Sequence, residues 1–275
     1  MLVEIQNLRV QFPTATGLSD AVRNVSLTLG QEKLGIVGES GSGKSLTARS
    51  IMRLLPGNAR ISADRLAFDG IDLLGADEAT LRKIRGGRAG LIMQDPKYSL
   101  NPVMTAGAQI AEAWRVHRGG SRRTADKAAL DLLTQVQIRD PERVARAYPH
   151  ELSGGMGQRV MIAMMLAPDP ELLIADEPTS ALDATVQAEI LRLIEDLVSR
   201  RGMGLILISH DLPLVSHFCD RVAVMYAGRI VEELAANELT RAKHPYTRGL
   251  LECLPSLTHP RPRLKVMQRD PSWLT

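Results

Sequence analysis

The stretch that decides the fold is Gly38-Glu39-Ser40-Gly41-Ser42-Gly43-Lys44-Ser45. Its spacing, G-x-x-x-x-G-K-[ST], is that of a phosphate-binding loop. A short apolar run, 34–37, precedes it, and a segment of helical character, 46–55, follows it. Glycines let backbone N–H groups curl around phosphate oxygens, and a helix start adds partial positive charge. The sequence therefore predicts a strand, a phosphate-binding loop and a helix, with Lys44 on the outer phosphates and Ser45 on Mg²⁺.

Composition excludes several classes of protein. The chain has 275 residues, of which 44% are hydrophobic, enough for one large or two small domains. No apolar run approaches the roughly 20 residues of a membrane helix, and no signal peptide is evident. We therefore expect the protein to lie in the cytosol, or on the cytosolic face of a membrane to which partners bind it. The net charge of +3 and the aromatic content of 3% do not favour a nucleic-acid partner. Cys219 and Cys253 form neither a disulfide framework nor a metal-ligand set.

The pattern of apolar residues predicts an α/β fold. Alternation over 3–10, 21–29 and 61–69 predicts strands that pair in an antiparallel manner. Buried-type strands at 88–93, 171–176 and 205–209 alternate with helices at 158–166 and 185–200, which predicts a parallel core. The segments 221–226 and 229–233 flank Ala227-Gly228 as a hairpin.

The remaining segments are helical or irregular. From about 105 to 146 the pattern indicates two amphipathic helices separated by a loop at 118–121. After His244 the chain is rich in proline, which predicts an irregular tail. The prolines are Pro245, Pro255, Pro260, Pro262 and Pro271.

Two carboxylates end the apolar strand at 172–175. In an open parallel sheet this end faces the ligand crevice. Asp176 suits an indirect contact with Mg²⁺, made through a ligand of the ion. Glu177 suits a base that polarises an attacking water. The alternative is a strand end whose carboxylates simply meet solvent.

A second anion-binding feature lies at 152–156. Ser153 is a good helix N-cap, and Gly154 and Gly155 bare the backbone at the helix start. Two phosphate cradles in one chain suggest that they belong to different nucleotide sites. The alternative is an ordinary capped helix.

Together these motifs resemble those of the ATPase subunits of ATP-binding-cassette (ABC) transporters, in order and spacing over roughly residues 1–235. The phosphate loop resembles Walker A, 172–177 resembles Walker B, and 152–156 resembles the family signature. Gln94 stands at the place of the Q-loop glutamine, 180–183 resembles the D-loop, and His210 resembles the switch histidine. The resemblance implies a P-loop NTPase cassette with a mixed-sheet core, an antiparallel β subdomain and a helical signature subdomain inserted at about 97–165. Residues 236–275 would form a C-terminal extension.

The resemblance also implies roles at the nucleotide. Two cassettes dimerise head to tail in this family, so that Ser153, Gly154 and Gly155 of one close on the γ-phosphate of ATP held by Lys44 of the other. Asp183 would communicate across that interface, and Phe12 would stack on adenine. A packed strand-end aromatic is the alternative for Phe12.

The catalytic and metal-binding roles follow in the same way. Glu177 would be the catalytic base, and His210 would contact the γ-phosphate. Ser45, Gln94 and Asp176 would organise Mg²⁺ and water.

Finer features resemble the oligopeptide, dipeptide and nickel importers of the family. They are 37–40, Asp95-Pro96 with 100–102, 159–164, and the C-terminal His244-Pro245-Tyr246-Thr247. Met156, where the wider family often has Gln, fits the same subgroup. Many relatives carry a cysteine-rich C-terminal iron–sulphur motif, but this chain has only Cys253 there, so we expect no cluster. A cluster of methionines at 156–165 is more typical of core packing than of a metal site.

The leading hypothesis is therefore an ATPase that powers import of oligopeptides or dipeptides; import of nickel or a metal chelate is the alternative. Its expected partners are two membrane permease chains, a second cassette ATPase and an extracytoplasmic substrate-binding protein. The region 98–102 and the helices to about 146 are candidates for the permease contact. A soluble repair or translation ATPase usually has a coiled-coil insertion or two cassettes. A regulatory module without turnover would lack Glu177 or His210.

Overall fold

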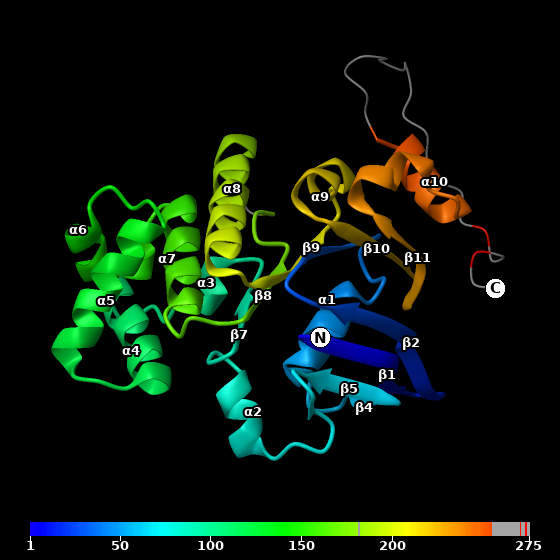
Figure 1. Ribbon diagram of the computed structural model, residues 1–275, viewed down its shortest axis with the longest axis horizontal. Coiled ribbons are helices and arrows are strands. Elements are labelled where there is room, and N and C mark those ends of the chain that lie inside the picture. Colours follow the sequence, from blue (N-terminus) through cyan, green and yellow to red (C-terminus); the bar gives the residue numbers. More distant parts are fainter. Residues whose placement is uncertain (181, 255–269, 271–272, 274–275) are drawn as a thin grey trace. The chain divides into compact units, whose positions relative to one another are not determined.

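A computed structural model of the chain describes residues 1–180, 182–254, 270 and 273. The chain forms two compact units. Unit 1 contains Val3–Leu74, the chain from Leu207 onward and Met1, and unit 2 contains Gly75–Ile206 and Leu2. Figure 1 labels the elements and colours them along the sequence, from blue at the N-terminus to red at the C-terminus. Among the described residues, no helix combines the length and apolarity needed to cross a bilayer.

An antiparallel sheet forms the first layer of unit 1, as the alternating sequence predicts. Its strand order is β2-β1-β5-β6, with β4 also paired to β1. Inward-facing residues such as Val3, Ile5, Leu8 and Val10 are buried, and helix α1 packs on β1 and β2. The bounds are β1 (Val3–Thr14), β2 (Gly17–Leu29), β4 (Arg60–Ser62), β5 (Arg65–Phe68), β6 (Ile71–Asp72) and α1 (Lys44–Ile51).

The single strand predicted at 61–69 is wrong, because two strands, β4 and β5, occupy that stretch. They pair with different parts of β1, on either side of Asn7. Asn7 has a positive φ of 51°, and the register of β1 shifts between Ile5 and Leu8. Asp64 sits at the break, where its N–H donates to the Gln6 carbonyl oxygen (3.0 Å). The irregularity in β1 therefore interrupts its partner strand.

The second layer of unit 1 is a mixed sheet. Parallel pairing joins β3 and β10, and antiparallel pairing joins β10 and β11 at the predicted hairpin. Helix α9 packs on β3 so closely that a Cβ on Gly35 would meet Val215. The bounds are β3 (Lys33–Val37), β9 (Gly204–Ser209), α9 (Leu212–Phe218), β10 (Arg221–Tyr226) and β11 (Arg229–Ala235). Strand β9 is divided between the units; it follows β3 in the strand order of unit 1 and precedes β8 in unit 2.

The prediction of an irregular tail after His244 is wrong for its first part. A 3-10 helix, η2 (Ala236–Arg241), is followed by helix α10 (Pro245–Glu252). Pro245 occupies the first turn of α10, where its missing N–H costs no helical hydrogen bond, and the His244 side chain caps the helix. Pro255, Pro260, Pro262 and Pro271 lie outside the described residues.

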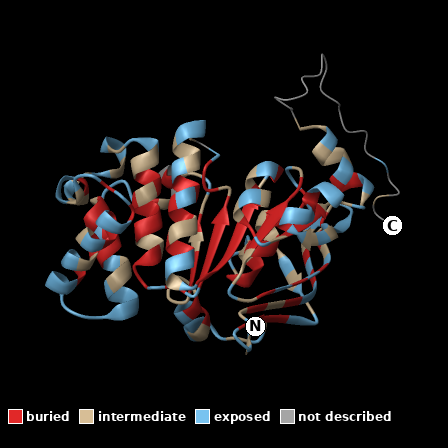
Figure 2. Cartoon of the chain, turned by 45° about the horizontal axis from the view of Figure 1, so that its top comes forward, coloured by how far each residue is buried: buried red, intermediate tan, exposed pale blue. Residues whose placement is uncertain are grey.

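Unit 2 combines parallel strands with helices. Strands β7 and β8 pair in parallel, from Ala89 opposite Leu172 to Ile92 opposite Ala175. Figure 2 shows that buried residues follow the strands, while the helices keep an exposed side. The bounds are α2 (Glu78–Ile84), β7 (Ala89–Ile92), α3 (Pro96–Ser99), α4 (Ala106–Arg118), α5 (Arg122–Gln135), α6 (Pro141–Arg146), η1 (Pro149–Glu151), α7 (Gly154–Leu166), β8 (Leu172–Asp176) and α8 (Ala184–Arg201). The predicted α/β class with mixed sheets is confirmed.

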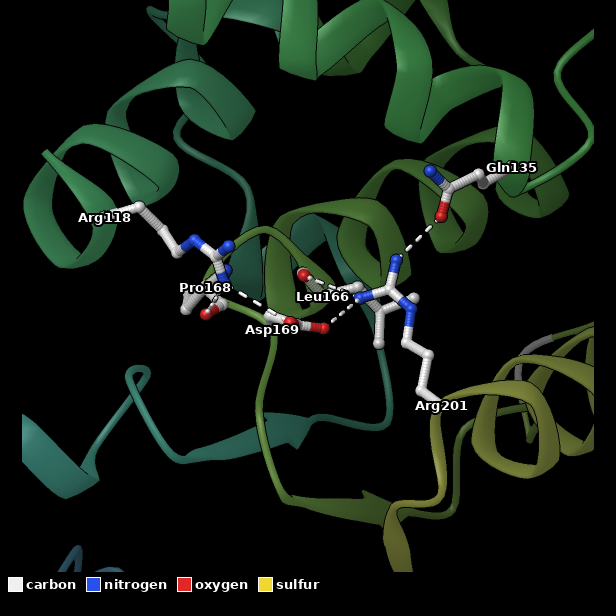
Figure 3. A network of polar contacts seen from close by, with 6 residues as sticks. All are labelled: Arg118, Gln135, Leu166, Pro168, Asp169 and Arg201. Carbon is white, nitrogen blue, oxygen red and sulfur yellow. Dashed lines mark hydrogen bonds and ion pairs between the residues drawn. The ribbon is translucent and has the colours of Figure 1, made fainter. Parts of the chain in front are cut away.

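A polar network fixes the turn between α7 and β8 (Figure 3). Asp169, whose φ is +65°, accepts from Arg118 at the end of α4 (3.3 Å) and from Arg201 at the end of α8 (3.2 Å). Arg201 also donates to the Leu166 carbonyl oxygen (3.1 Å) and to Gln135 Oε1 at the end of α5 (2.7 Å). Helices α4, α5 and α8 are thereby tied to the C-terminal end of helix α7.

Candidate functional site

The predicted phosphate loop connects β3 to α1 in unit 1. Gly38, Gly41 and Gly43 have φ values of 147°, 80° and 99°, in the region that favours glycine. A Cβ on Gly38 would lie 2.1 Å from the Met225 carbonyl oxygen, and one on Gly43 would lie 2.9 Å from the Ala21 carbonyl oxygen. Gly38 and Gly43 are therefore required both by backbone conformation and by the walls around the loop, whereas Gly41 is required by conformation alone.

Lys44 begins helix α1 and is only 5% exposed. Its Nζ donates to the carbonyl oxygens of Gly38 and Glu39, both at 2.8 Å. The Ser42 hydroxyl is also buried and has no hydrogen-bond partner among the described residues. A buried ammonium, an unpartnered hydroxyl and a helix start converge on one turn, which suits an anion with several oxygens. Ser40 and Gly41 are exposed on the loop, and Ser45 is half-buried behind it.

Unit 1 carries two further predicted site residues. His210 is exposed directly after β9, and Asp211 next to it caps α9 by accepting from the Leu214 N–H (3.0 Å). Phe12 is half-buried on β1, opposite Ser19 of β2.

The predicted acidic pair ends strand β8 in unit 2. Asp176 is the last residue of the strand and is 4% exposed. Glu177 follows with a φ of +49°, an uncommon conformation for a residue with a side chain. The buried Gln158 of α7 donates from Nε2 to the Pro178 carbonyl oxygen (2.5 Å), which fixes the chain just after Glu177. Strained backbone of this kind persists where the surroundings determine it, commonly at functional sites.

The signature-like stretch caps helix α7 as expected. The Ser153 hydroxyl accepts from the Met156 N–H (3.3 Å). A Cβ on Gly155 would lie 2.8 Å from Val186 of α8, and one on Gly154 would lie 3.3 Å from Leu182. The glycines thus let the start of α7 approach the start of α8 closely.

Asp183 holds the start of α8 itself. Its carboxylate accepts from the N–H groups of Thr185 and Val186, both at 3.1 Å. Ala181, within the predicted D-loop, lies outside the described residues.

Gln94 follows strand β7 and is exposed at a cavity of about 600 Å³ in unit 2. Prolines and backbone from the signature side line the same cavity. The lining includes Pro96, Leu100, Pro102, Pro149, His150, Leu152, Ser153, Gly154 and Leu182. The Q-loop and the signature stretch therefore share one hollow.

The residue types predicted for a metal ion suit magnesium. The hydroxyl of Ser45, the amide oxygen of Gln94 and the carboxylate of Asp176 are hard oxygen ligands, which Mg²⁺ prefers together with phosphate oxygens and water. The predicted set contains no thiol or imidazole that would favour a softer metal.

Two residues at these sites were missed by the motif analysis. Gln158 carries no motif signal of its own, because its importance comes from the carbonyl group it reaches. Tyr246 belongs to the noted His-Pro-Tyr-Thr segment, and its hydroxyl accepts from the Glu39 N–H of the phosphate loop (3.0 Å). Only the folded arrangement brings these partners together.

The strand–loop–helix unit, the α/β fold and the acidic strand end define a P-loop nucleotide hydrolase. The profile of the ABC transporter family matches residues 22–180. The chain is 50% identical over 258 residues to the probable peptide ABC transporter ATP-binding protein y4tR of Sinorhizobium fredii, covering 93% of this chain and 77% of that protein. It is 46% identical over 265 residues to the dipeptide transport ATP-binding protein DppD of Escherichia coli, covering 96% and 81%.

Solved structures agree. The dimeric post-hydrolysis structure of the ATP-binding cassette MJ0796, bound to ADP and Pi, superposes with a TM-score of 0.75 at 29% identity, covering 86% of this chain and 99% of that chain. CbiO1 of Clostridium perfringens superposes with a TM-score of 0.72 at 26% identity, covering 86% and 91%. This chain belongs to the ABC transporter family and is an ATP-hydrolysing subunit. Membership implies permease partners, dimerisation and peripheral association with a membrane.

Proposed function

We propose that this chain hydrolyses ATP to power the import of oligopeptides or dipeptides through a multi-subunit transporter. The observation that carries the proposal is the identity of 46% to 50% to peptide-transport ATP-binding proteins across more than nine-tenths of the chain. The predicted bounds, a cassette at 1–235 with a helical subdomain at about 97–165 and a C-terminal extension at 236–275, are part of this proposal.

The phosphate loop is the proposed site for the outer phosphates of ATP. The buried Lys44 ammonium and the unpartnered Ser42 hydroxyl support this role. On binding, the ammonium exchanges its two carbonyl partners for phosphate oxygens, which carry full negative charge and bind it more strongly. Ser45, Gln94 and Asp176 would hold Mg²⁺, which would neutralise phosphate charge.

Glu177 is the proposed general base. It takes a proton from the attacking water as the water oxygen bonds to the γ-phosphorus. The bond from that phosphorus to the bridging oxygen of ADP breaks, which leaves ADP and inorganic phosphate. His210 is proposed to contact the γ-phosphate, and Phe12 to stack on adenine.

The signature stretch is proposed to act in trans. Ser153, Gly154 and Gly155 of one cassette would contact the γ-phosphate on a second cassette, and Asp183 would signal between the two. The cap geometry at Ser153 supports this, because it leaves other amides of the first turn of α7 open to an anion. The second cassette is either another copy of this chain or a related chain.

The region 98–102 and the helices to about 146 are the proposed permease contact. Leu100 and Pro102 of this region line the cavity beside Gln94. The partners would be two membrane permeases and an extracytoplasmic substrate-binding protein, and the chain would then lie on the cytoplasmic face of the membrane. Nickel or a metal chelate remains the alternative cargo, favoured only by the subgroup resemblance.

Two experiments test the proposal. Gentle solubilisation of membranes followed by mass spectrometry should recover two polytopic permeases and a second cassette with this chain. Recovery of ribosomes or DNA repair proteins instead would contradict an importer. Uptake of labelled dipeptide against labelled nickel in the assembled transporter then separates the two cargoes.

The variant Glu177→Gln tests the mechanism. It should bind ATP as well as the wild type and lower turnover by about a hundredfold or more, because it keeps the shape but not the base. In the presence of ATP, a stable dimer of the variant should then accumulate, and light scattering should detect it. Equal turnover of variant and wild type would exclude Glu177 as the base.

A further inference from the structure

Helix α10 reaches the phosphate loop from the C-terminal part of unit 1. Tyr246 in its first turn is fully buried, and its Oη accepts the Glu39 N–H at 3.0 Å. Glu39 is the second residue of the phosphate loop. A segment more than 200 residues downstream in sequence therefore supplies a hydrogen bond inside the motif.

The other side of the same residue holds the lysine. The Glu39 carbonyl oxygen accepts from Lys44 Nζ at 2.8 Å, and so does the Gly38 carbonyl oxygen. Gly38 lies close to β10, because a Cβ built on it would come within 2.1 Å of the Met225 carbonyl oxygen. Two residues thus define the start of the loop: Met225 lies against Gly38, and Tyr246 accepts a hydrogen bond from Glu39.

Tyr246 is itself held firmly. Its ring lies 4.4 Å from the ring of Tyr226 and 5.7 Å from that of Trp273, measured between centroids. Its N–H donates to His244 Nδ1 (3.2 Å), which caps the helix. Glu232 of β11 accepts from the N–H groups of Lys243 (2.6 Å) and His244 (3.2 Å). We call Glu232 together with residues 243–247 the C-terminal clamp.

We propose that Tyr246 is a positioning residue for the phosphate loop and that the C-terminal clamp thereby sets the affinity for nucleotide. A loop whose amides are fixed before binding loses less conformational freedom when ATP arrives. Losing the Tyr246 hydroxyl leaves the Glu39 N–H without this acceptor, so the loop and the Lys44 that it holds sample other conformations. The effect falls on binding, because the hydroxyl reaches the loop entry and not the acidic pair. This inference rests on the phosphate loop being the nucleotide site.

The test is Tyr246→Phe in the full chain, which keeps the ring in its aromatic cluster. We expect the dissociation constant for MgATP, measured by calorimetry, to rise about fivefold, the worth of one ordinary hydrogen bond. In ATPase assays of the assembled transporter, KM should rise similarly while kcat stays within about twofold. Amide exchange should speed up in the peptide 34–45. Tyr226→Phe removes a hydroxyl from the same cluster and is the matched control, expected to bind like the wild type.

Lys44→Ala separates the positioning role of Tyr246 from the assignment of the phosphate site itself. If it abolishes binding while Tyr246→Phe binds like the wild type, the positioning role is wrong and the phosphate site stands. If Lys44→Ala binds MgATP normally, the phosphate site itself is wrong. A fall in kcat at unchanged KM in Tyr246→Phe, or faster exchange throughout unit 1, would also overturn the positioning role.

Discussion

Gln158 Nε2 donates to the carbonyl oxygen of Pro178 at 2.5 Å, which joins helix α7 to the chain just after Glu177. Gln158 is 1% exposed. The signature-like stretch begins α7, and the proposed base precedes Pro178, so one side chain links the two features within unit 2. The link gives the helix a direct hold on the backbone that presents Glu177 in its left-handed conformation.

Gln158→Leu should uncouple this link. The change keeps similar volume but leaves the Pro178 carbonyl group without its donor, at a cost of about 1–3 kcal/mol in unfolding free energy. Because the base would then be held less accurately, we expect turnover to fall by about tenfold to a hundredfold with nucleotide affinity retained. A time course of phosphate release measures the turnover, and calorimetry measures the nucleotide affinity. Gln31→Leu, at an exposed turn, is the control; retained turnover in Gln158→Leu would contradict the argument.

Close packing at Gly155 gives a second prediction. Because a Cβ there would lie 2.8 Å from Val186 Cγ1, Gly155→Ala should overpack the contact of α7 with α8 and cost about 1–3 kcal/mol. Gly154→Ala meets Leu182 at 3.3 Å and should cost less.

The double variant Gly155→Ala with Val186→Ala checks the cause. Removing the valine methyl groups frees the space that the new methyl group needs, so the melting temperature should return toward that of Val186→Ala alone. A double variant no more stable than Gly155→Ala would show that the glycine matters for another reason.

The network at Asp169 allows charge and backbone conformation to be separated. Asp169→Asn keeps a side chain that tolerates the φ of +65° but removes the charge paired with Arg118 and Arg201. The Asp169 side chain is 55% exposed, so solvent screening limits the loss to about 1 kcal/mol or less. Asp169→Ala should lose about 1 kcal/mol more, because alanine is unfavourable at this φ.

Salt distinguishes the two contributions. Thermal unfolding at low and at 0.5–1 M NaCl (about 3 Å screening length at 1 M) should bring Asp169→Asn close to the wild type, because the ion pairs are screened. The deficit of Asp169→Ala relative to Asp169→Asn should persist in salt. If Asp169→Asn and Asp169→Ala responded to salt in the same way, the positive φ of residue 169 would make no separate contribution to stability.

The sequence predicts the fold well where one local rule decides the outcome. The loop motif specifies glycines at 38 and 43, and the structure gives both of them positive φ values. Ser153 reads as a cap, and its hydroxyl caps α7. Prediction fails where partners distant in sequence decide: the break opposite Asn7 depends on the register of β1, and helix α10 starts at a proline that reads as a breaker.

The same limit applies to the site. A motif search finds residues that act on ATP in this family, whereas Gln158 and Tyr246 act on backbone groups that become neighbours only in the folded chain. Among the predicted site residues, Glu177→Gln tests the proposed base and Lys44→Ala tests the proposed phosphate site.

The C-terminal clamp should weaken in acid. Burial alone would raise the pKa of the Glu232 carboxyl, but the nearby Thr247 hydroxyl, the N–H groups of Lys243 and His244 and the charge of His244 outweigh it and leave this pKa below its usual 4.5. A carboxyl group with a lowered pKa in the folded state contributes stability above its unfolded pKa, and the contribution disappears as pH falls through the folded pKa. The docking of α10 should therefore be constant from neutral pH to about 5 and decline below about 4.5.

Glu232→Gln isolates this contribution, because the amide keeps the shape and can still accept but has no charge to titrate. At pH 7.5 the wild type should melt at a higher temperature than Glu232→Gln, and the difference should shrink as the pH falls below 4.5 and the wild-type carboxyl becomes protonated. The backbone N–H groups of Lys243 and His244 are present in both proteins, so the variant changes only the acceptor. A difference that stays constant down to pH 3.5, or one that grows in acid, would show that the Glu232 charge does not hold the C-terminal clamp.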